Sequence, residues 1–179
     1  MKGIVFTEFL ELVEQKFGLE MVDTIIEESK LASGGVYTSV GTYNFSEMLQ
    51  LLGNLSKHTG IATDDLLFVY AEHFFTALKR SYSSFFDMYK DPIEMLSSIE
   101  NHIHVEVIKI YPDAELPTFD VLEKTDDSLV MIYKSSRAMH CFGLGLMQST
   151  FAHFNTQATI LTEKLKEDGT EVKFVIHKT

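Results

Sequence analysis

Two short stretches of this sequence carry side chains that could do chemistry together. The first holds His102 and His104 within an otherwise apolar helical pattern that stops at Tyr111-Pro112. An imidazole in such a setting is a potential metal ligand. The second is the pentapeptide Tyr133-Lys-Ser-Ser-Arg137, which offers a phenol, a hydroxyl and a guanidinium at alternate positions. The sequence therefore pairs a soft ligand with a group of hydrogen-bond donors.

The pentapeptide suits an anion. On a strand, Tyr133, Ser135 and Arg137 would point to the same face. The planar fork of Arg137 matches a carboxylate with two hydrogen bonds. Taken alone, such a triplet is more often a polar strand edge that meets water. Together with one neutral imidazole, however, a carboxylate clamp is what a protein needs to hold haem, because the iron takes an axial ligand and the propionates take donors.

Geometry allows at most one of the two neighbouring histidines to serve as that ligand. His102 and His104 lie about 200° apart around a helix, so they cannot face the same pocket. Both have apolar neighbours one turn away, so periodicity does not choose between them. A lone histidine is more often an ordinary surface or core residue, and that interpretation applies to the remaining five: His58, His73, His140, His153 and His177. His73 and His140 stay in reserve as candidates, because they fall on helices near the expected cofactor.

Four features together resemble one family. They are the opening Met1-Lys2-Gly3, a histidine seven residues before Tyr111-Pro112, Pro117, and the Tyr-x-Ser-x-Arg pattern. The chain resembles the haem-nitric oxide/oxygen binding (H-NOX) domain, the bacterial relative of the haem domain of soluble guanylate cyclase. The resemblance runs from Met1 to the C-terminus.

The resemblance implies a cofactor and the residues that hold it. The cofactor would be haem b, Fe protoporphyrin IX, with His104 as axial ligand and His102 as a more exposed neighbour. Tyr133, Ser135 and Arg137 would bind the propionates. Pro117 would press against a pyrrole ring and keep the haem out of plane, although a loop turn is its plainer role.

The resemblance also implies which gases bind. In oxygen-binding members a tyrosine lies nine residues past the first tyrosine of the clamp, and that position here is Phe142. The other matching positions of the distal pocket are Val5, Phe9, Phe74, Leu78 and Leu146. None of them can donate a hydrogen bond to bound O₂, which favours NO and CO at ferrous haem. Ordinary core packing is the alternative for these residues, and Tyr70 is the phenol that could reach the iron.

The resulting hypothesis is a gas sensor rather than an enzyme. NO would weaken the bond between iron and His104, free the helix that carries it, and let the haem flatten away from Pro117. Such a two-state element biased by a ligand is what a switch requires. The resemblance suggests a separate histidine kinase or cyclic-dinucleotide enzyme as partner. The alternatives are a haem-dependent oxygen-binding protein, a peroxidase with a distal acid–base group, and a domain that takes no haem.

Composition limits the other partners. A net charge of −11 argues against nucleic acid and anionic membranes. A single cysteine, Cys141, excludes a disulfide framework, and the segment 162–169 lacks the Cys and His ligands that some relatives use for zinc. We therefore predict no zinc. Acidic residues near the start and the lack of a long apolar run predict a cytoplasmic protein.

Periodicity predicts the elements that position these residues. Helices are expected over 3–17, 19–31, 44–57, from 63 onward, from Asp91-Pro92 to Tyr111, and over 138–154. Asn44 with Glu47 suggests a capping box, and residues 63–65 suggest another cap. Hairpins are expected over 118–135 and 156–176. The fold class is α+β, as one H-NOX domain with a helical N-terminal subdomain, 1–62, and a haem-ligating subdomain with an antiparallel sheet, 63–179.

Overall fold

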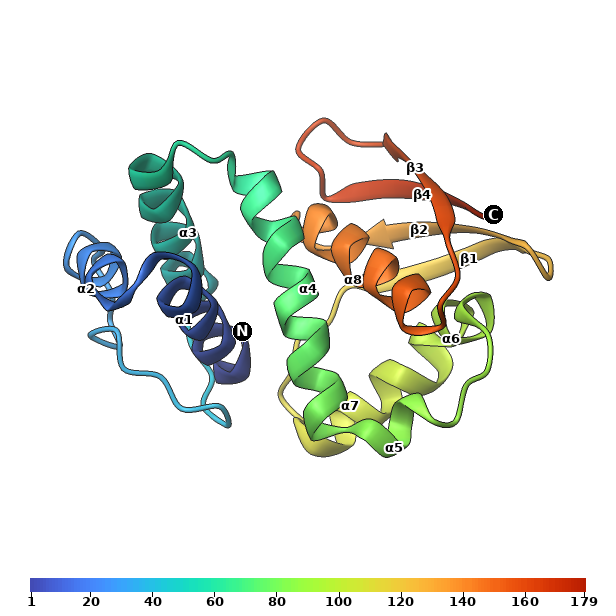
Figure 1. Cartoon of the computed structure of the whole chain (residues 1–179), viewed down its shortest axis with the longest axis horizontal. Coiled ribbons are helices and arrows are strands. Elements are labelled where there is room, and N and C mark those ends of the chain that lie inside the picture. The colour runs from blue at the N-terminus through green and yellow to red at the C-terminus, as the bar shows by residue number, and fades with distance from the viewer.

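The computed structural model describes residues 1–179 and has helices at one end and an antiparallel sheet at the other (Figure 1). Three helices form the end that lacks the sheet: α1 (Gly3–Phe17), α2 (Leu19–Glu27) and α3 (Phe45–Thr59). The long helix α4 (Thr63–Ser81) lies between this group and the rest of the chain. Its buried residues Leu66, Leu67, Tyr70 and Phe74 share one apolar cluster with α1, α2 and α3. The predicted α+β class is confirmed.

The helices at this end follow the predicted apolar spacing, but three details differ. The second helix stops at Glu27 instead of Leu31. Asn44 does cap α3 through the Ser46 N–H, whereas Glu47 turns into the core and accepts hydrogen bonds from Ser33 Oγ and Tyr37 Oη. No side chain caps α4, so the acidic residues of its first turn act through the helix dipole. Long-range partners, invisible in the local pattern, explain the loss of the capping box.

The helix that carries the two histidines is broken, although a continuous one was predicted. It consists of α6 (Pro92–Ser97), a π-helical turn, η1 (Ile99–Ile103), and α7 (His104–Ile110). The Ile103 N–H bonds to the Ser98 carbonyl, five residues earlier, at 3.2 Å. A π turn contains one extra residue and rotates the residues after it, and such turns are frequent at functional sites. The short helix α5 (Ser83–Phe86) connects α4 to this segment.

Four antiparallel strands form the sheet, in the order β1-β2-β4-β3. The strands are β1 (Thr118–Lys124), β2 (Ser128–Lys134), β3 (Ala158–Lys164) and β4 (Glu171–Lys178), as the two predicted hairpins require. Alternate residues of β2 and β4 are buried on the face that packs against α8 (His140–His153). Phe119 on the edge strand β1 pairs with Tyr133 on β2, so the sheet brings the pentapeptide next to the loop after α7.

Helices α4 and α8 approach each other closely at Gly145. A Cβ atom at this position would lie 2.6 Å from Ala71 Cβ and 2.7 Å from the Phe68 carbonyl oxygen. The same atom at Gly143 would find its nearest neighbour at 3.9 Å, on Phe119. Of the two glycines, only Gly145 is therefore needed for the close approach of the two helices.

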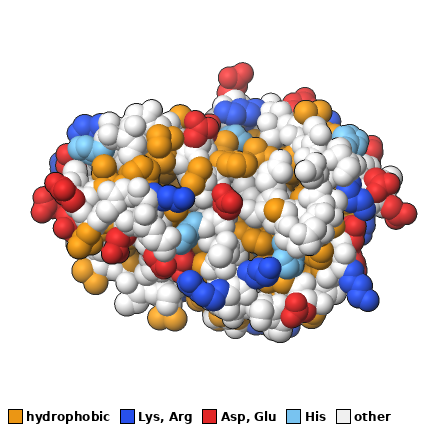
Figure 2. Space-filling view, viewed as in Figure 1, with side chains coloured by type: hydrophobic (Ala, Val, Ile, Leu, Met, Phe, Trp, Pro, Cys, Tyr) orange, Lys and Arg blue, Asp and Glu red, His pale blue; other side chains and the backbone are white.

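Charged and apolar side chains alternate over the face of the molecule in Figure 2. Acidic groups are prominent at both ends of this view, in keeping with the net charge of −11. None of the helices combines the length and the apolar character that crossing a bilayer requires.

Candidate functional site

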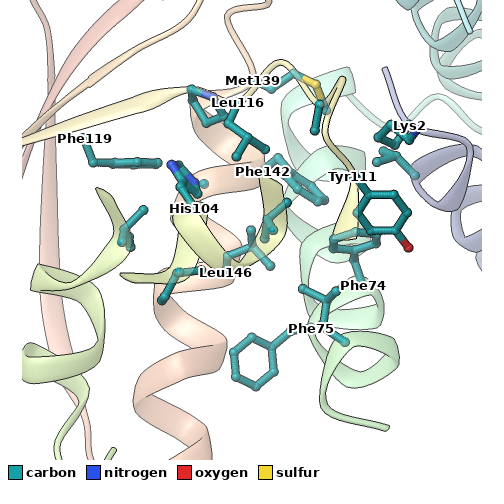
Figure 3. A pocket seen from close by; sticks show the side chains of 18 of the residues that line it. Lys2, Phe74, Phe75, His104, Tyr111, Leu116, Phe119, Met139, Phe142 and Leu146 are labelled. Atoms are coloured by element: carbon teal, nitrogen blue, oxygen red, sulfur yellow. The ribbon is translucent and has the colours of Figure 1, made fainter. Parts of the chain in front are cut away.

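A single large apolar cavity lies between α4, α8, the α6–α7 segment and the loop that leads into β1 (Figure 3). Its volume is about 370 Å³, and 23 of its 32 lining residues are hydrophobic. Cavities of this size and character are typical of small-molecule and cofactor sites. The cavity is therefore the place to test the residues singled out from the sequence.

His104 is the only histidine that lines the cavity. Its side chain is 16% exposed, and Nδ1 lies 3.0 Å from Glu100 Oε1. Burial lowers the pKa of His104, while the Glu100 carboxylate acts in the opposite direction. The imidazole is therefore neutral at neutral pH, which is the form that binds a metal.

His102 lies outside this cavity. Its Nδ1 is 2.5 Å from Tyr89 Oη, and its ring packs against Phe85 with centroids 5.1 Å apart. Its burial is intermediate, as is that of His104, so its role as the more exposed neighbour stays a prediction. The structure brings one of the two histidines to the cavity, as the geometry of a helix requires.

The three donors of the pentapeptide also line the cavity, but they do not share a strand face. Strand β2 ends at Lys134, and Ser135 and Arg137 follow in a turn in which the Arg137 N–H donates to Ser135 Oγ at 3.2 Å. The prediction of one continuous strand is wrong. Tyr133 Oη accepts a hydrogen bond from the Met139 N–H at 3.0 Å, and burial raises its pKa. The turn, rather than strand alternation, gathers these donors.

Arg137 already holds a carboxylate at the edge of the cavity. Its Nη2 donates to Glu115 Oε2 at 2.5 Å, and its Nη1 donates to the Glu115 carbonyl oxygen at 2.8 Å. The guanidinium is 16% exposed, whereas the Glu115 side chain is 83% exposed. A carboxylate of a bound molecule could therefore replace an exposed partner. This contact is the structural observation that fits a cofactor with acidic groups.

Most of the residues assigned to the distal pocket line the cavity, and one does not. Val5, Phe74, Leu78, Phe142 and Leu146 all contribute to its wall, as does Pro117. Phe9 lies outside the wall: it is completely buried and packs edge-to-face against Tyr70, with ring centroids 5.3 Å apart. The assignment of Phe9 to the pocket is therefore not supported by its position.

The hydroxyl of Tyr70 does not reach the cavity. The ring is fully buried, and its Oη donates to the Val5 carbonyl oxygen at 2.5 Å. Two other phenols, Tyr82 and Tyr111, do line the cavity, with their oxygens 3.2 Å apart. Burial raises the pKa of Tyr111 to about 12. The labelled Tyr111 ring lies away from His104 in Figure 3, with its hydroxyl directed outward.

Sequence reasoning overlooked Glu100, Glu115 and Tyr82, and it used Tyr111 only as part of the Tyr-Pro motif. Glu100 precedes His104 by four residues, a spacing that places side chains together on a helix and could have been noticed. Glu115 lies in an irregular loop, and Tyr82 meets Tyr111 across 29 residues. No local pattern encodes those contacts.

A second group of potential ligands lies outside the cavity. Glu8 and Glu11 on α1 and His73 on α4 have ligand atoms within 4.8 Å of one another. His73 Nε2 is 3.2 Å from Glu8 Oε2, and Arg80 Nη2 is 3.9 Å from Glu8 Oε1. These contacts form a polar network between two helices, and the absence of zinc stays a prediction.

A family model described as Haem-NO-binding matches residues 2–162 of the chain. The crystal structure of the Fe(II) unliganded H-NOX protein from K. algicida is 72% identical, with a TM-score of 0.98, over 100% of this chain and 97% of that one. The solution structure of the IWP-051-bound H-NOX from Shewanella woodyi in the Fe(II)CO state is 36% identical. Its TM-score is 0.85, over 100% of this chain and 95% of that one.

A more distant likeness concerns the fold alone. The crystal structure of an H-NOX protein from S. oneidensis in the Fe(II)NO state is 21% identical, with a TM-score of 0.91, over 100% of this chain and 99% of that one. No curated protein matches the chain.

Proposed function

The chain belongs to the H-NOX family of haem-binding gas-sensor domains, and from that premise we propose that it senses NO. In this proposal it holds haem b through His104, binds NO and CO at ferrous iron, and discriminates against O₂. The observation that carries the proposal is the position of His104, the only imidazole that lines a large apolar cavity. That cavity also has a carboxylate-binding arginine at its edge.

Each residue has a defined task in holding the cofactor. His104 offers Nε2, because Nδ1 is occupied by Glu100. Arg137 would exchange Glu115 for a propionate, and Tyr133 and Ser135 would add neutral hydrogen bonds. Pro117, rigid and in the cavity wall, would press the ring out of plane. A haem bound here would supply a ferrous iron that takes up diatomic gases opposite His104.

The walls of the cavity support the preference for NO and CO. Stable O₂ binding depends on hydrogen-bond donors in the distal pocket, and Val5, Phe74, Leu78, Phe142 and Leu146 offer none. Tyr70, the donor that could have changed this argument, uses its hydroxyl on the Val5 carbonyl oxygen. The alternative, an oxygen-binding protein or sensor, is favoured by one observation: the phenols of Tyr82 and Tyr111 line the same cavity.

Release of His104 from the iron would be the signal. His104 is the first residue of α7, and the π turn before it provides a place where the helix can readjust. The loop after α7 contacts the start of the chain: Asp113 accepts hydrogen bonds from Lys2 Nζ at 2.9 Å and from Thr42 Oγ1 at 2.6 Å. A shift of α7 can therefore reach Lys2, the residue that precedes α1, through this loop.

In this mechanism the N-terminal subdomain, 1–62, moves relative to the haem-ligating subdomain, 63–179. A separate histidine kinase or cyclic-dinucleotide enzyme in the cytoplasm would bind the moved form differently. The chain itself would then act as a sensor and not as a catalyst. Differential contact with the two states is what lets a ligand shift such an equilibrium.

Absorption spectra of the purified protein test the proposal. The ferrous protein should change its spectrum with NO and with CO under anaerobic conditions, and it should form no stable complex in air. A stable oxygen complex would favour the oxygen-binding alternative. A colourless protein that cannot be loaded with haem would exclude both, and rapid turnover of peroxide would indicate an enzyme.

A pair of variants at one position sharpens this test. Phe142→Tyr introduces a phenol into the cavity wall and should allow an oxygen complex to form. Phe142→Leu keeps the wall apolar and should behave as the wild type does in air. If both variants respond to oxygen alike, the wall does not select the gas by hydrogen bonding.

A further inference from the structure

The carboxylate beside His104 belongs to Glu100, in the π turn that precedes α7. One oxygen of Glu100, Oε1, makes two contacts: it lies 3.0 Å from His104 Nδ1 and accepts a hydrogen bond from the Phe119 N–H at 2.9 Å. The Glu100 side chain is 35% exposed, so the pair is shielded from solvent in part. Its oxygen thus joins the histidine segment to the edge of the sheet.

The Phe119 contact explains why the carboxylate stays in place. Strand β1 is an edge strand, so the N–H groups that point away from β2 have no partner in the sheet. Phe119 pairs with Tyr133 in the sheet register, and its own ring lies 6.1 Å from the ring of His104. Glu100 therefore occupies a fixed position between the proposed iron ligand and the strand pair that leads to the propionate clamp. An ordinary exposed helix pair would lack this second anchor.

The contact also fixes the state of the imidazole. An ionised carboxylate can only accept hydrogen bonds, so His104 Nδ1 must carry the proton. Nε2 is then left with its lone pair, the form that coordinates a metal. A carboxylate at the outer nitrogen makes the imidazole more basic and orients the ring, as it does for histidine ligands in many metal sites.

We infer that Glu100 is a positioning residue. It sets the strength of the iron–His104 bond and, through that bond, how readily and how fast NO releases His104. This inference rests on the proposed function, since it assumes that His104 is the axial ligand. The charge of Glu100 strengthens the bond, and its anchor on Phe119 holds the released imidazole near its starting position for rebinding. Weakening the contact makes the release of His104 easier without removing the ligand.

The variants Glu100→Gln and Glu100→Asp separate charge from position. Gln keeps the size and an acceptor oxygen but removes the charge, whereas Asp keeps the charge on a shorter arm. Glu94→Gln, at an exposed position on α6, is the control for removing a negative charge from the same segment. Resonance Raman spectroscopy of the ferrous protein reports the iron–histidine vibration directly. NMR of the diamagnetic CO complex reports the proton on His104 Nδ1.

In Glu100→Gln we expect a lower iron–histidine frequency and faster exchange of the Nδ1 proton. The rate of His104 release after NO is added should rise about 10- to 100-fold, the usual effect of losing an outer partner of a metal ligand. Glu100→Asp should recover part of the wild-type frequency, and Glu94→Gln should match the wild type.

Two outcomes would overturn the two proposals separately. If haem binds and NO responds normally, but Glu100→Gln leaves both the vibration and the release rate unchanged, the role of Glu100 is wrong and the proposed sensor stands. If His104→Ala, measured without added imidazole, keeps the iron–histidine frequency of the wild type, His104 is not the ligand. Both proposals are then wrong.

Discussion

The cavity has two helical walls that are built in opposite ways. One wall is formed by α4 and α8, which bury seven and six residues respectively and meet at Gly145 without room for a Cβ atom. The other is formed by η1 and α7, which bury no residue completely. The first wall belongs to the core of the protein. The second wall covers the cavity from one side.

This difference separates stability from response. Segments with few buried contacts open at low free energy, whereas core helices open only when the whole domain unfolds. We call the wall formed by η1 and α7 the yielding wall, and the wall formed by α4 and α8 the firm wall. His104, the residue proposed to bind iron, lies on the yielding wall. The residues proposed to face the gas, such as Phe142 and Leu146, lie on the firm wall. In the proposed mechanism, breaking the iron–His104 bond would therefore move one wall while the pocket keeps its shape on the other side.

The largest effect should come from the yielding wall and should concern haem. His104→Ala should lose the iron–histidine bond and most of the bound haem, and added imidazole should restore the spectrum. The fold should change little, because α7 contributes no fully buried residue. Haem absorbance together with thermal unfolding of the same samples checks both statements. A large loss of secondary structure on substitution would contradict the contrast between the walls.

The firm wall should show the reverse behaviour. Gly145→Ala should lower the free energy of unfolding by about 1–3 kcal/mol or more, because its methyl group would clash with Ala71 and the Phe68 carbonyl. Gly143→Ala is the matched control on the same helix. Its methyl group meets only ordinary contacts, and helix propensity favours alanine by about 1 kcal/mol. Denaturant titration of both variants decides, and equal destabilisation would show that the approach at Gly145 is not special.

A smaller loss is expected at Tyr70, which joins the firm wall to α1. Tyr70→Phe removes the hydroxyl that bonds to the Val5 carbonyl oxygen and should cost about 0.5–1.5 kcal/mol of unfolding free energy. Tyr82→Phe, whose hydroxyl meets only that of Tyr111, should cost less. If Tyr70→Phe also changed the behaviour towards oxygen, the phenol would have to reach the cavity after all.

The smallest effect concerns pH and the start of α8. His140 is 8% exposed, its Nδ1 has no partner, and burial lowers its pKa below the usual value of 6.5. Just below pH 6.5, His140 is therefore protonated more in the unfolded chain than in the folded protein. Stability is complete above about pH 6.5 and falls as the pH drops below it, by at most about 1.4 kcal/mol per pH unit for one proton.

Unfolding free energies measured between about pH 5 and 7.5 should show this slope. His140→Gln should make the slope shallower. An unchanged slope in the variant would mean that other groups are responsible, among them His153, whose pKa burial also lowers.

The sequence predicted the firm wall better than the yielding one. Helix α4 was expected from residue 63 onward and α8 over 138–154, close to the observed Thr63–Ser81 and His140–His153. The π turn was not inferred, because the apolar pattern does not distinguish the Ile103 N–H to Ser98 carbonyl bond from the hydrogen bonds of an ordinary helix. The end of β2 was missed because the ladder continues to Ser135, whose N–H bonds to the Thr170 carbonyl beside β4, and the turn that redirects Arg137 begins only after it.

The candidate site was predictable where family resemblance or local spacing applied. Resemblance selected His104 over His102, which periodicity alone left undecided. Glu100 was within reach as an i,i+4 pair, but its second contact with Phe119 depends on the path of an edge strand. Glu115 and Tyr82 meet their partners only after the chain has folded, so no pattern in the sequence points to them.

The contact between Asp113 and Lys2 has a consequence for the conditions in which such a device operates. The Asp113 side chain is 59% exposed, so dissolved ions can screen its attraction to the Lys2 ammonium group. The proposed coupling of α7 to the N-terminal helices would then depend on ionic strength. Binding of the gas in the apolar cavity would not. The same amount of bound gas would then move the N-terminal helices less at high ionic strength than at low ionic strength.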